Sequence, residues 1–410
     1  MVETPVALPE IEAAARKPRA GIALCLSGGG FRASLFHLGA LRRLHELGVL
    51  ERVDKISSVS GGSIFAGFLA NQLVAKAPGQ SIAALDWEKD VAAPFRAFVH
   101  RDLRTIPFFA HLLWNWAFPQ FRARHLERLY RERLTPLALQ QLPARPAFTF
   151  CATDLTFGVN WEFTREDAGD YQAGYLAEAA AWPVARAVAA SSCFPPIFGP
   201  LPIRAPADHF KRGKYAGSDR RKLLGRIGLS DGGVYDNMGL EPAWKNYSYV
   251  LISDCGAPFR FTAGTNAIFR LMRYTSVVMN QALSLRKRFF FSDVNDGKYR
   301  GVYWPIQRVV EHAPPGAAFV GYSQSLVDDV ISKIRTDLDS FSRTECLVLE
   351  NHGYTVADEA VRRRVPELIG PHPAPFAVPG PAWTDEATVR HALRDSASRI
   401  SLRRLFGMNT

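Results

Sequence analysis

The chain has 410 residues, of which 47% are hydrophobic and 22% are charged, and this balance predicts a globular protein with one large core or two modest ones. No window reaches the roughly 18 consecutive apolar residues of a membrane-spanning helix. The first 20 residues mix acids, prolines and arginines where a signal peptide has an apolar core. These features disfavour a spanning or secreted protein, and we expect a cytoplasmic one.

The formal net charge of +11 indicates an anionic partner, which is nucleic acid, an anionic membrane surface or an acidic substrate. The sign of the charge alone does not choose among them. The five cysteines are widely spaced and form no CxxC pair or Cys/His cluster. We therefore expect buried, reduced thiols, and neither a disulfide framework nor a zinc site.

The first 76 residues contain two successive units of strand, small-residue loop and helix. In the first unit an apolar run from Ile22 to Leu26 precedes three glycines and a helical pattern that ends at Gly48. Residues 53–76 repeat the plan. Strands that alternate with helices predict an α/β fold with a mostly parallel central sheet flanked by helices in three layers, and its ligand site lies at the carboxyl ends of the strands.

The rest of the chain predicts one main domain. Residues 87–134 are dense in aromatics and then in arginines, so we expect a helical insertion that is either a satellite core or a lid or acyl-chain groove. Later strands are expected at 147–155, 159–166 and 301–310 and within 226–258, and later helices at 175–191, 267–291 and 325–341. The predicted boundaries are an N-terminal extension over 1–20, the domain over 21–360, and a proline-rich linker with a basic helix over 361–410.

The segment "SVSGGS" puts a serine where a strand turns sharply into a helix. This is the geometry of a nucleophile elbow, whose usual signature is G-x-S-x-G, and small neighbours are needed because bulk would clash in the turn. Ser60 is the central serine, and Ser58 stands where the motif prefers glycine. Ser58 is still small, so the departure weakens the match without breaking it. The alternative is a turn of small residues that opens a helix for packing reasons.

Three glycines, Gly28, Gly29 and Gly30, lie between the first strand and the first helix. Their backbone N–H groups suit an oxyanion or a phosphate at the positive end of a helix. A nucleotide-binding loop and a plain tight turn are the alternatives. The dinucleotide pattern fits only loosely, because Arg32 stands two residues after the last of these glycines, and the Gly-Lys-Ser/Thr ending of a P-loop is missing.

A nucleophilic serine needs a base. His37 and His45 lie in the first helix, where a histidine is more often packed or solvated than catalytic. Asp231 follows a short apolar run and precedes two glycines, which places a carboxylate at the mouth of a sheet, although an Asx turn would use the same residues. Two other carboxylates at strand ends compete with it: Asp254 and Asp154.

The blocks "SGGGFRA", "SVSGGS", "ASSCFPPIF" and "SDGGVYDN" occur in this order, and together they resemble the patatin-like phospholipase family, including its cytosolic phospholipase relatives. The resemblance is carried by residues 20–75, 148–158, 186–200 and 229–256. It implies a Ser-Asp dyad of Ser60 and Asp231 without a catalytic histidine, and no metal or organic cofactor. It also implies that the glycine loop forms the oxyanion hole.

Two further residue roles follow from the resemblance. The oxyanion hole would consist of the backbone N–H groups of Gly28, Gly29 and Gly30, and Arg32 would either steady this loop or meet a phospholipid phosphate. Because a carboxylate is a weak base for an alcohol, we expect a partly dry site that raises the pKa of Asp231 towards neutrality.

The implied function is hydrolysis of acyl esters in phospholipids or lysophospholipids. Acyl transfer to an alcohol or a second lipid, and a catalytically silent lipid-binding scaffold, are the alternatives. A nucleic-acid binder would explain the charge but none of the three motifs. Two basic stretches beside apolar residues, 285–291 and 398–406, indicate peripheral contact with an anionic membrane, whereas solvated surface or a core strand end is the plainer interpretation.

Overall fold

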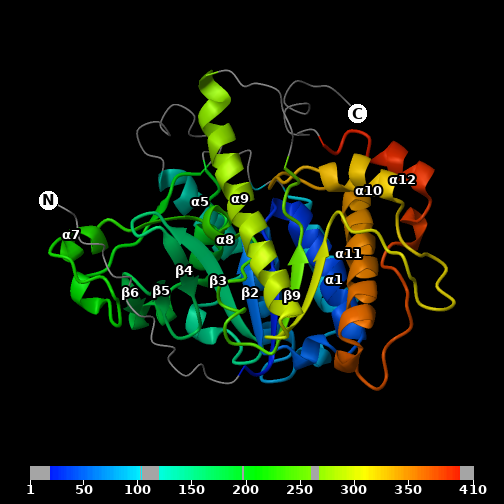
Figure 1. Ribbon diagram of the computed structural model, residues 1–410, viewed down its shortest axis with the longest axis horizontal. Coiled ribbons are helices and arrows are strands. Elements are labelled where there is room, and N and C mark those ends of the chain that lie inside the picture. The colour runs from blue at the N-terminus through cyan, green and yellow to red at the C-terminus, as the bar shows by residue number, and fades with distance from the viewer. Residues whose placement is uncertain (1–18, 102, 104–119, 196–197, 260–266, 398–410) are drawn as a thin grey trace, which may run out of the picture.

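The computed structural model describes residues 19–101, 103, 120–195, 198–259 and 267–397. Their main feature is a sheet with the strand order β10, β9, β1, β2, β3, β4, β5, β6, and the short β8 pairs with both β3 and β7 (Figure 1). The strands are β1 (Ile22–Leu26), β2 (Lys55–Val59), β3 (Ala147–Asp154), β4 (Val159–Phe163), β5 (Ala168–Asp170), β6 (Gly174–Leu176), β7 (Leu201–Pro202), β8 (Gly228–Asp231), β9 (Tyr249–Asp254) and β10 (Arg300–Pro305).

The sheet is parallel at its centre and antiparallel on one side. Strands β10, β9, β1, β2 and β3 are parallel neighbours, and β4, β5 and β6 continue from β3 as antiparallel strands. The helices are α1 (Gly30–Glu46), α2 (Gly61–Lys76), α3 (Ala93–Val99), α5 (Gln120–Arg133), α6 (Val184–Ser191), α7 (Arg220–Leu224), α8 (Gly233–Asp236), α9 (Ala267–Asn295), α10 (Gln324–Asp329), α11 (Arg343–Arg364) and α12 (Glu386–Ala392). The predicted α/β fold with helices flanking a mostly parallel central sheet is confirmed.

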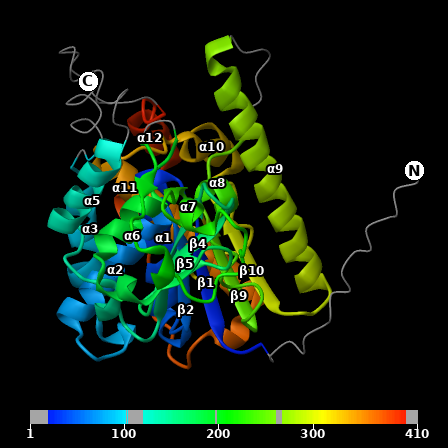
Figure 2. The ribbon, with the colours of Figure 1, turned by 90° about the vertical axis from the view of Figure 1, so that its left-hand side faces the viewer.

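Both faces of the central strands are buried, as the continuous apolar run of β1 requires. Ile22, Leu24 and Leu26 contribute to the larger core, which includes residues of α1, α2 and α11, while Ala23 and Cys25 belong to a smaller core beneath α9. Figure 2 shows α9 on one side of the sheet and α1, α2 and α11 on the other. The three predicted layers are therefore present, and all five cysteines are buried free thiols as expected.

Helix α11 was missed by the sequence prediction, and it crosses α1 at unusually close range. A Cβ atom added at Gly39 of α1 would lie 2.0 Å from the backbone oxygen of Glu350, and one added at Gly353 of α11 would lie 2.0 Å from that of Phe36. Each helix thus uses a glycine to admit the backbone of the other. This contact fixes α1, whose first residue belongs to the glycine loop.

Two predicted helices are wrong in part. Tyr175 and Leu176 pair with β5 as strand β6, and the helix begins only after Pro183, because a proline inside it would remove a hydrogen bond and clash with the preceding turn. The predicted helix over 325–341 is confined to α10 and a 3-10 turn that ends at Lys333. Beyond that turn, the buried Arg335 pairs with Asp339 and with Glu345, a residue of the first turn of α11.

The predicted domain boundary after residue 360 falls inside α11. Beyond that helix the chain returns to α1, where the N–H groups of Gly370 and Ala374 donate to the backbone oxygens of Leu47 and Glu46. The described part of the 361–410 segment is therefore packed against the main domain. The aromatic part of the 87–134 insertion and the terminal basic stretch 398–406 lie outside the described residues.

No helix within the described ranges combines the length and the apolar composition needed to cross a bilayer.

The α1/α11 crossing predicts the effect of adding one methyl group. Gly353→Ala should lower the free energy of unfolding by about 3 kcal/mol, because the added carbon meets backbone that is held on both sides. Gly225→Ala is the matched control, since its added carbon would lie 3.6 Å from the nearest atoms and its φ of −72° suits alanine. Urea denaturation of both variants measures the difference, and equal stabilities would contradict the close contact.

Candidate active site

The site lies where two strands meet end to end along one edge of β3. Strand β2 runs parallel to β3 and ends with Val59 opposite Cys151, while β8 runs antiparallel to β3 and ends with Asp231 opposite Ala152. Cys151 and Ala152 are consecutive, so the two strand ends face each other across one residue step. The residue after β2 is Ser60, and this register brings it next to Asp231.

Ser60 occupies a strained turn. Its φ is 50° and its ψ is −116°, and among the described residues only Ser60 and Arg212 have positive φ without being glycine. Such a conformation costs on the order of 1–3 kcal/mol and persists only where the surroundings impose it. Helix α2 begins immediately after Ser60, which is the strand, sharp turn and helix of a nucleophile elbow.

The elbow and the glycine loop are packed backbone against backbone. A Cβ atom added at Gly61 would lie 2.1 Å from the oxygen of Gly30, and one added at Gly62 would lie 2.3 Å from the oxygen of Leu26. An added Cβ at Gly28 would lie 3.1 Å from the Cβ of Ser60. The glycines are therefore needed at these positions because nothing larger lets the two turns approach this closely.

The backbone N–H groups around Ser60 differ in their availability. The N–H of Gly28 donates to the backbone oxygen of Asn237 at 3.0 Å, which removes Gly28 from the predicted oxyanion hole. The N–H groups of Gly29 and Gly30 have no acceptor among the described residues, and neither has that of Gly61. Gly30 and Gly61 are the first residues of α1 and α2, where the helix dipole favours negative charge.

Gly61 was not among the predicted residues, although the sequence contained its signal. A nucleophile elbow presents the N–H of the residue that follows the nucleophile, so the identification of Ser60 implied a donor at the next position.

Asp231 is buried, with 1% of its surface exposed. Its Oδ1 accepts the N–H of Gly233 at 2.7 Å, and its Oδ2 has no hydrogen-bond partner within the described ranges. Burial raises the pKa of Asp231 to about 7, against smaller lowering effects from the Ser60 hydroxyl and the Gly233 N–H. Ser60 is thus close enough to influence the carboxylate without the geometry of an ordinary hydrogen bond, as is common before substrate binds.

The segment from Ser191 to Cys193 holds both residues. The Oγ of Ser191 accepts the N–H of Ser60 at 2.9 Å and donates to the oxygen of Cys151 at 2.6 Å. The backbone oxygen of Ser191 accepts the N–H of Gly232, and that of Cys193 accepts the N–H of Asp231. One turn of chain at the end of α6 therefore fixes the elbow and the strand that carries the carboxylate.

Ser58, the departure from the elbow motif, belongs to the same support. Its hydroxyl donates to the oxygen of Thr149 and lies 3.0 Å from the Oγ of Ser63, which in turn lies 2.9 Å from the Oγ of Ser191. The serine that replaces the usual glycine thus extends a buried hydroxyl network beneath the turn.

Arg32 points into the protein and is 2% exposed. Its guanidinium group donates to the backbone oxygens of Cys255, Ser332 and Ile334 at 2.7 to 3.0 Å. A Cβ atom added at Gly29 would lie 2.5 Å from the same backbone oxygen of Cys255. Of its two predicted roles, the geometry favours steadying the glycine loop and leaves no guanidinium face for a phosphate.

The competing bases have other partners. His37 is buried between Ser253 Oγ (2.8 Å) and the oxygen of Ser27 (3.0 Å), and burial lowers its pKa to about 4. Asp254 receives hydrogen bonds from Tyr303 and the backbone and an ion pair from Lys287. Burial tends to raise its pKa, but Lys287 and Tyr303 outweigh this effect and the pKa lies below its usual range.

Asp154 and His45 are also engaged away from the elbow. Asp154 accepts the N–H of Thr156 at 2.6 Å, and burial raises its pKa while its carboxyl group interacts with that of Asp170. His45 stacks on Trp87 with ring centroids 5.4 Å apart. These contacts leave Asp231 as the strand-end carboxylate that adjoins Ser60.

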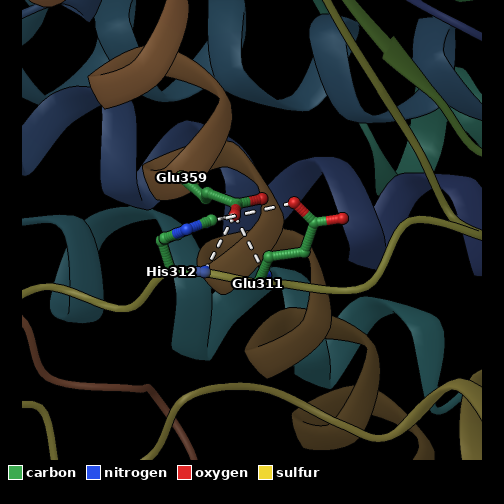
Figure 3. A group of neighbouring side chains, drawn as sticks. All are labelled: Glu311, His312 and Glu359. Carbon is green, nitrogen blue, oxygen red and sulfur yellow. Dashed lines mark hydrogen bonds and ion pairs between the residues drawn. The ribbon is translucent and has the colours of Figure 1, made fainter.

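One cluster elsewhere has the donor types of a metal site. Ligand atoms of Glu311, His312 and Glu359 lie within 4.8 Å of one another in the described part of the chain (Figure 3). The Glu359 carboxylate already accepts the N–H groups of Glu311 and His312 and pairs with Arg308 at 2.8 Å, and Arg363 lies 3.0 Å from Glu311. Two guanidinium groups thus neutralise these carboxylates, so we assign the cluster to surface ion pairing.

Comparison with known proteins assigns the chain to a family. The family model described as patatin-like phospholipase matches residues 24–244, more than half of the sequence, and includes Ser60 and Asp231. The chain belongs to this family. No curated protein sequence matches it.

Solved structures that the chain resembles at low identity include a human cytosolic phospholipase A2 and a Legionella protein. Human GIVD cytosolic phospholipase A2 is 12% identical, with a TM-score of 0.44 over 92% of this chain and 63% of that one. Its complex with methyl gamma-linolenyl fluorophosphonate and terbium chloride has a TM-score of 0.47 at 12% identity over 85% and 59% of the two chains. VipD from Legionella pneumophila is 14% identical, with a TM-score of 0.35 over 85% and 68%. The chain thus spans under two thirds of the human enzyme, and these likenesses add nothing to the family assignment.

The buried carboxyl group of Asp231 predicts a pH-dependent stability difference. Its folded-state pKa of about 7 lies above the unfolded value of about 3.9, so between these values the folded protein binds more protons and loses stability as pH rises. Asparagine does not titrate. The free energy of unfolding of Asp231→Asn, minus that of wild type, should therefore be on the order of 2 kcal/mol higher at pH 8 than at pH 5.

Urea denaturation at both pH values measures this gain. The control is Asp254→Asn, because the lowered pKa of Asp254 keeps that group ionised throughout the range and its difference from wild type should stay constant. A constant difference for Asp231→Asn as well would contradict the raised pKa.

Proposed function

We propose that this patatin-like protein hydrolyses acyl ester bonds of phospholipids or lysophospholipids, with Ser60 as nucleophile and Asp231 as base. The observation that carries the proposal is the meeting of β2 and β8 along β3, which sets a strained serine beside a buried carboxylate. The raised pKa of Asp231, about 7, gives this carboxylate a basicity that an exposed aspartate lacks.

The reaction proceeds in two halves. Asp231 accepts the hydroxyl proton as the Oγ of Ser60 attacks the ester carbonyl carbon, and the resulting oxyanion is stabilised by the N–H groups of Gly29, Gly30 and Gly61. The tetrahedral intermediate collapses, and the leaving alcohol takes the proton from Asp231. Water then attacks the acyl-enzyme by the same route, which releases the fatty acid and restores the serine.

The same groups support acyl transfer if an alcohol or a second lipid replaces water, and the products of the reaction distinguish the two. The silent scaffold has less support. A strained turn and an unpaired buried carboxylate oxygen both lower stability, and a purely structural role gives no reason to retain them.

The proposal includes a cytoplasmic location and contact with an anionic membrane. Five buried free thiols suit the reducing cytoplasm. The net charge of +11 suits transient contact with an anionic membrane, which would present the substrate.

Loss of either member of the dyad should abolish ester hydrolysis. With p-nitrophenyl esters of short and medium acyl chains, Ser60→Ala and Asp231→Asn should each lower kcat/KM by at least about 10³-fold. Ser192→Ala is the matched control, because Ser192 is a buried serine of the adjacent segment whose hydroxyl group donates to the oxygen of Val188 at 2.7 Å and lies 3.3 Å from the Tyr130 hydroxyl, away from the dyad. Folding is checked by circular dichroism, and an active, folded Ser60→Ala protein would refute the assignment.

The basic form of Asp231 is the ionised one, so activity should follow its titration. We expect kcat/KM to rise about tenfold per pH unit below a pKa of about 7 and to level off above it. A series of rates from pH 5 to pH 9 measures this profile. A flat profile across that range would show that no group with the pKa of Asp231 acts as the base.

A further inference from the structure

Helix α9 is much longer than the strands that it connects. It links the parallel strands β9 and β10 and therefore runs antiparallel to them, so its first residues lie towards the carboxyl ends of the strands. Its 29 residues span about 44 Å, whereas the six residues of β10 span only about 20 Å. Figures 1 and 2 show its N-terminal end extending beyond the body of the protein.

The C-terminal half of α9 is anchored beside the candidate active site. Phe290 is buried in the smaller core, with Leu283 packed against it. On neighbouring positions, Arg286 lies 3.5 Å from the carboxylate of Asp236, five residues after Asp231, and Lys287 lies 3.0 Å from that of Asp254. The inner face of the helix is therefore fixed to the segment that follows β8 and to the last residue of β9.

The outer face of α9 is apolar and exposed. Of the ten large hydrophobic side chains that are exposed within the described ranges, six belong to this helix. Tyr274, Val278, Leu285 and Phe289 follow one another at spacings of four, seven and four residues, which places them on one helical face. Their exposed fractions are 59%, 67%, 47% and 54%. These four side chains form an exposed apolar stripe that the polar Gln281 interrupts. At its C-terminal end, Leu285 and Phe289 border a groove, across which the rings of Trp244 and Phe289 lie 6.4 Å apart.

The charge along α9 is entirely positive over most of its length. Residues 267–292 contain five basic side chains and no acidic one. Two of them, Arg270 and Arg288, are exposed and lie eighteen residues apart, five helical turns, along the margin of the apolar stripe. An apolar face bordered by arginines is the arrangement of a helix that lies in the interface of an anionic membrane.

We propose that the outer face of α9, formed by Tyr274, Val278, Leu285 and Phe289 with Arg270 and Arg288 at its margin, docks on an anionic lipid surface. The proposal rests on the proposed function, since it names the surface that meets the substrate. It also revises the expectation for 285–291: Leu285 and Phe289 face outward while Phe290 is buried, so the lipid-facing residues are set by helical spacing and extend back to Tyr274.

A second copy of the chain is the other occupant to consider. A symmetric pair of α9 helices would bring the basic side chains of both copies together, and this helix offers no acidic side chain before Asp293 to pair with them. Lipid phosphates supply the missing negative charge. Because α9 begins at the carboxyl edge of the sheet, the edge that carries Ser60 and Asp231, docking along α9 would bring the lipid surface beside that edge.

Vesicle binding tests the proposal in a protein that cannot consume the lipid. The background is full-length Ser60→Ala, and the probes are vesicles of phosphatidylglycerol mixed with phosphatidylcholine and vesicles of phosphatidylcholine alone. Val278→Asp should weaken cosedimentation with the anionic vesicles at least tenfold, and Leu285→Ser with Phe289→Ser should do so by a similar factor. The matched control is Val320→Asp, a valine that is 49% exposed on a loop outside α9, and it should bind like the background protein.

Binding of the background protein should also be weaker to neutral vesicles and at high salt. Equal binding by Val278→Asp and Val320→Asp, or no binding of the background protein to anionic vesicles, would overturn the proposal. Self-association that Val278→Asp abolishes, measured by sedimentation velocity, would instead assign the face to a second copy.

Two further readouts separate this proposal from the proposed function. With Ser60 intact, Val278→Asp should hydrolyse soluble p-nitrophenyl esters at the wild-type rate, and loss of that activity would mean that the substitution damages the site itself. Binding of the background protein to anionic vesicles, together with a wild-type protein that is inactive on all esters, would refute the hydrolase and leave the docking surface standing.

Discussion

The arrangement of the site depends on one buried hydroxyl group, that of Ser191. Its oxygen accepts the N–H of Ser60 and donates to the backbone of β3, while the backbone of the same short segment holds Gly232 and Asp231. A strained turn does not persist unless its surroundings impose it. Here one turn of chain, residues 191–193, is hydrogen-bonded to the elbow, to β3 and to the strand that ends with Asp231. The separation of Ser60 and Asp231 therefore follows from backbone geometry rather than from a direct bond between their side chains.

Close backbone packing adds a second constraint. Gly61 and Gly62 admit the glycine loop against the elbow, and Gly39 and Gly353 admit α11 against α1, the helix that begins in that loop. Arg32 then secures the far side of the loop by donating to three backbone oxygens. The glycine loop beside Ser60 is therefore held from both sides. Such rigidity is what electrostatic stabilisation of an oxyanion requires, because donors already in place need not reorganise during the reaction.

Much of this arrangement was predictable from local sequence. The two strand-to-helix units, the elbow serine and the Asp-Gly-Gly turn each follow from short patterns, and the order of the motifs indicated the family. The rest depends on contacts between distant segments. Sequence alone did not reveal that β8 is antiparallel to β3, that the Gly28 N–H donates to the oxygen of Asn237, or that Arg335 is buried and pairs with Glu345 of α11. Nor did it predict α11, whose polar and apolar residues are buried together against α1.

The central claim is that Ser60 is a nucleophile activated by Asp231, and covalent labelling tests it most directly. A fluorophosphonate reacts with an activated serine hydroxyl and leaves a stable adduct that peptide mass spectrometry can locate. Our account predicts a single adduct, on the peptide that contains Ser60 and on that serine rather than on Ser58 or Ser63, and it predicts slow or absent labelling in folded Asp231→Asn. An adduct on a different serine, or equally fast labelling in the folded Asp231→Asn protein, would contradict it.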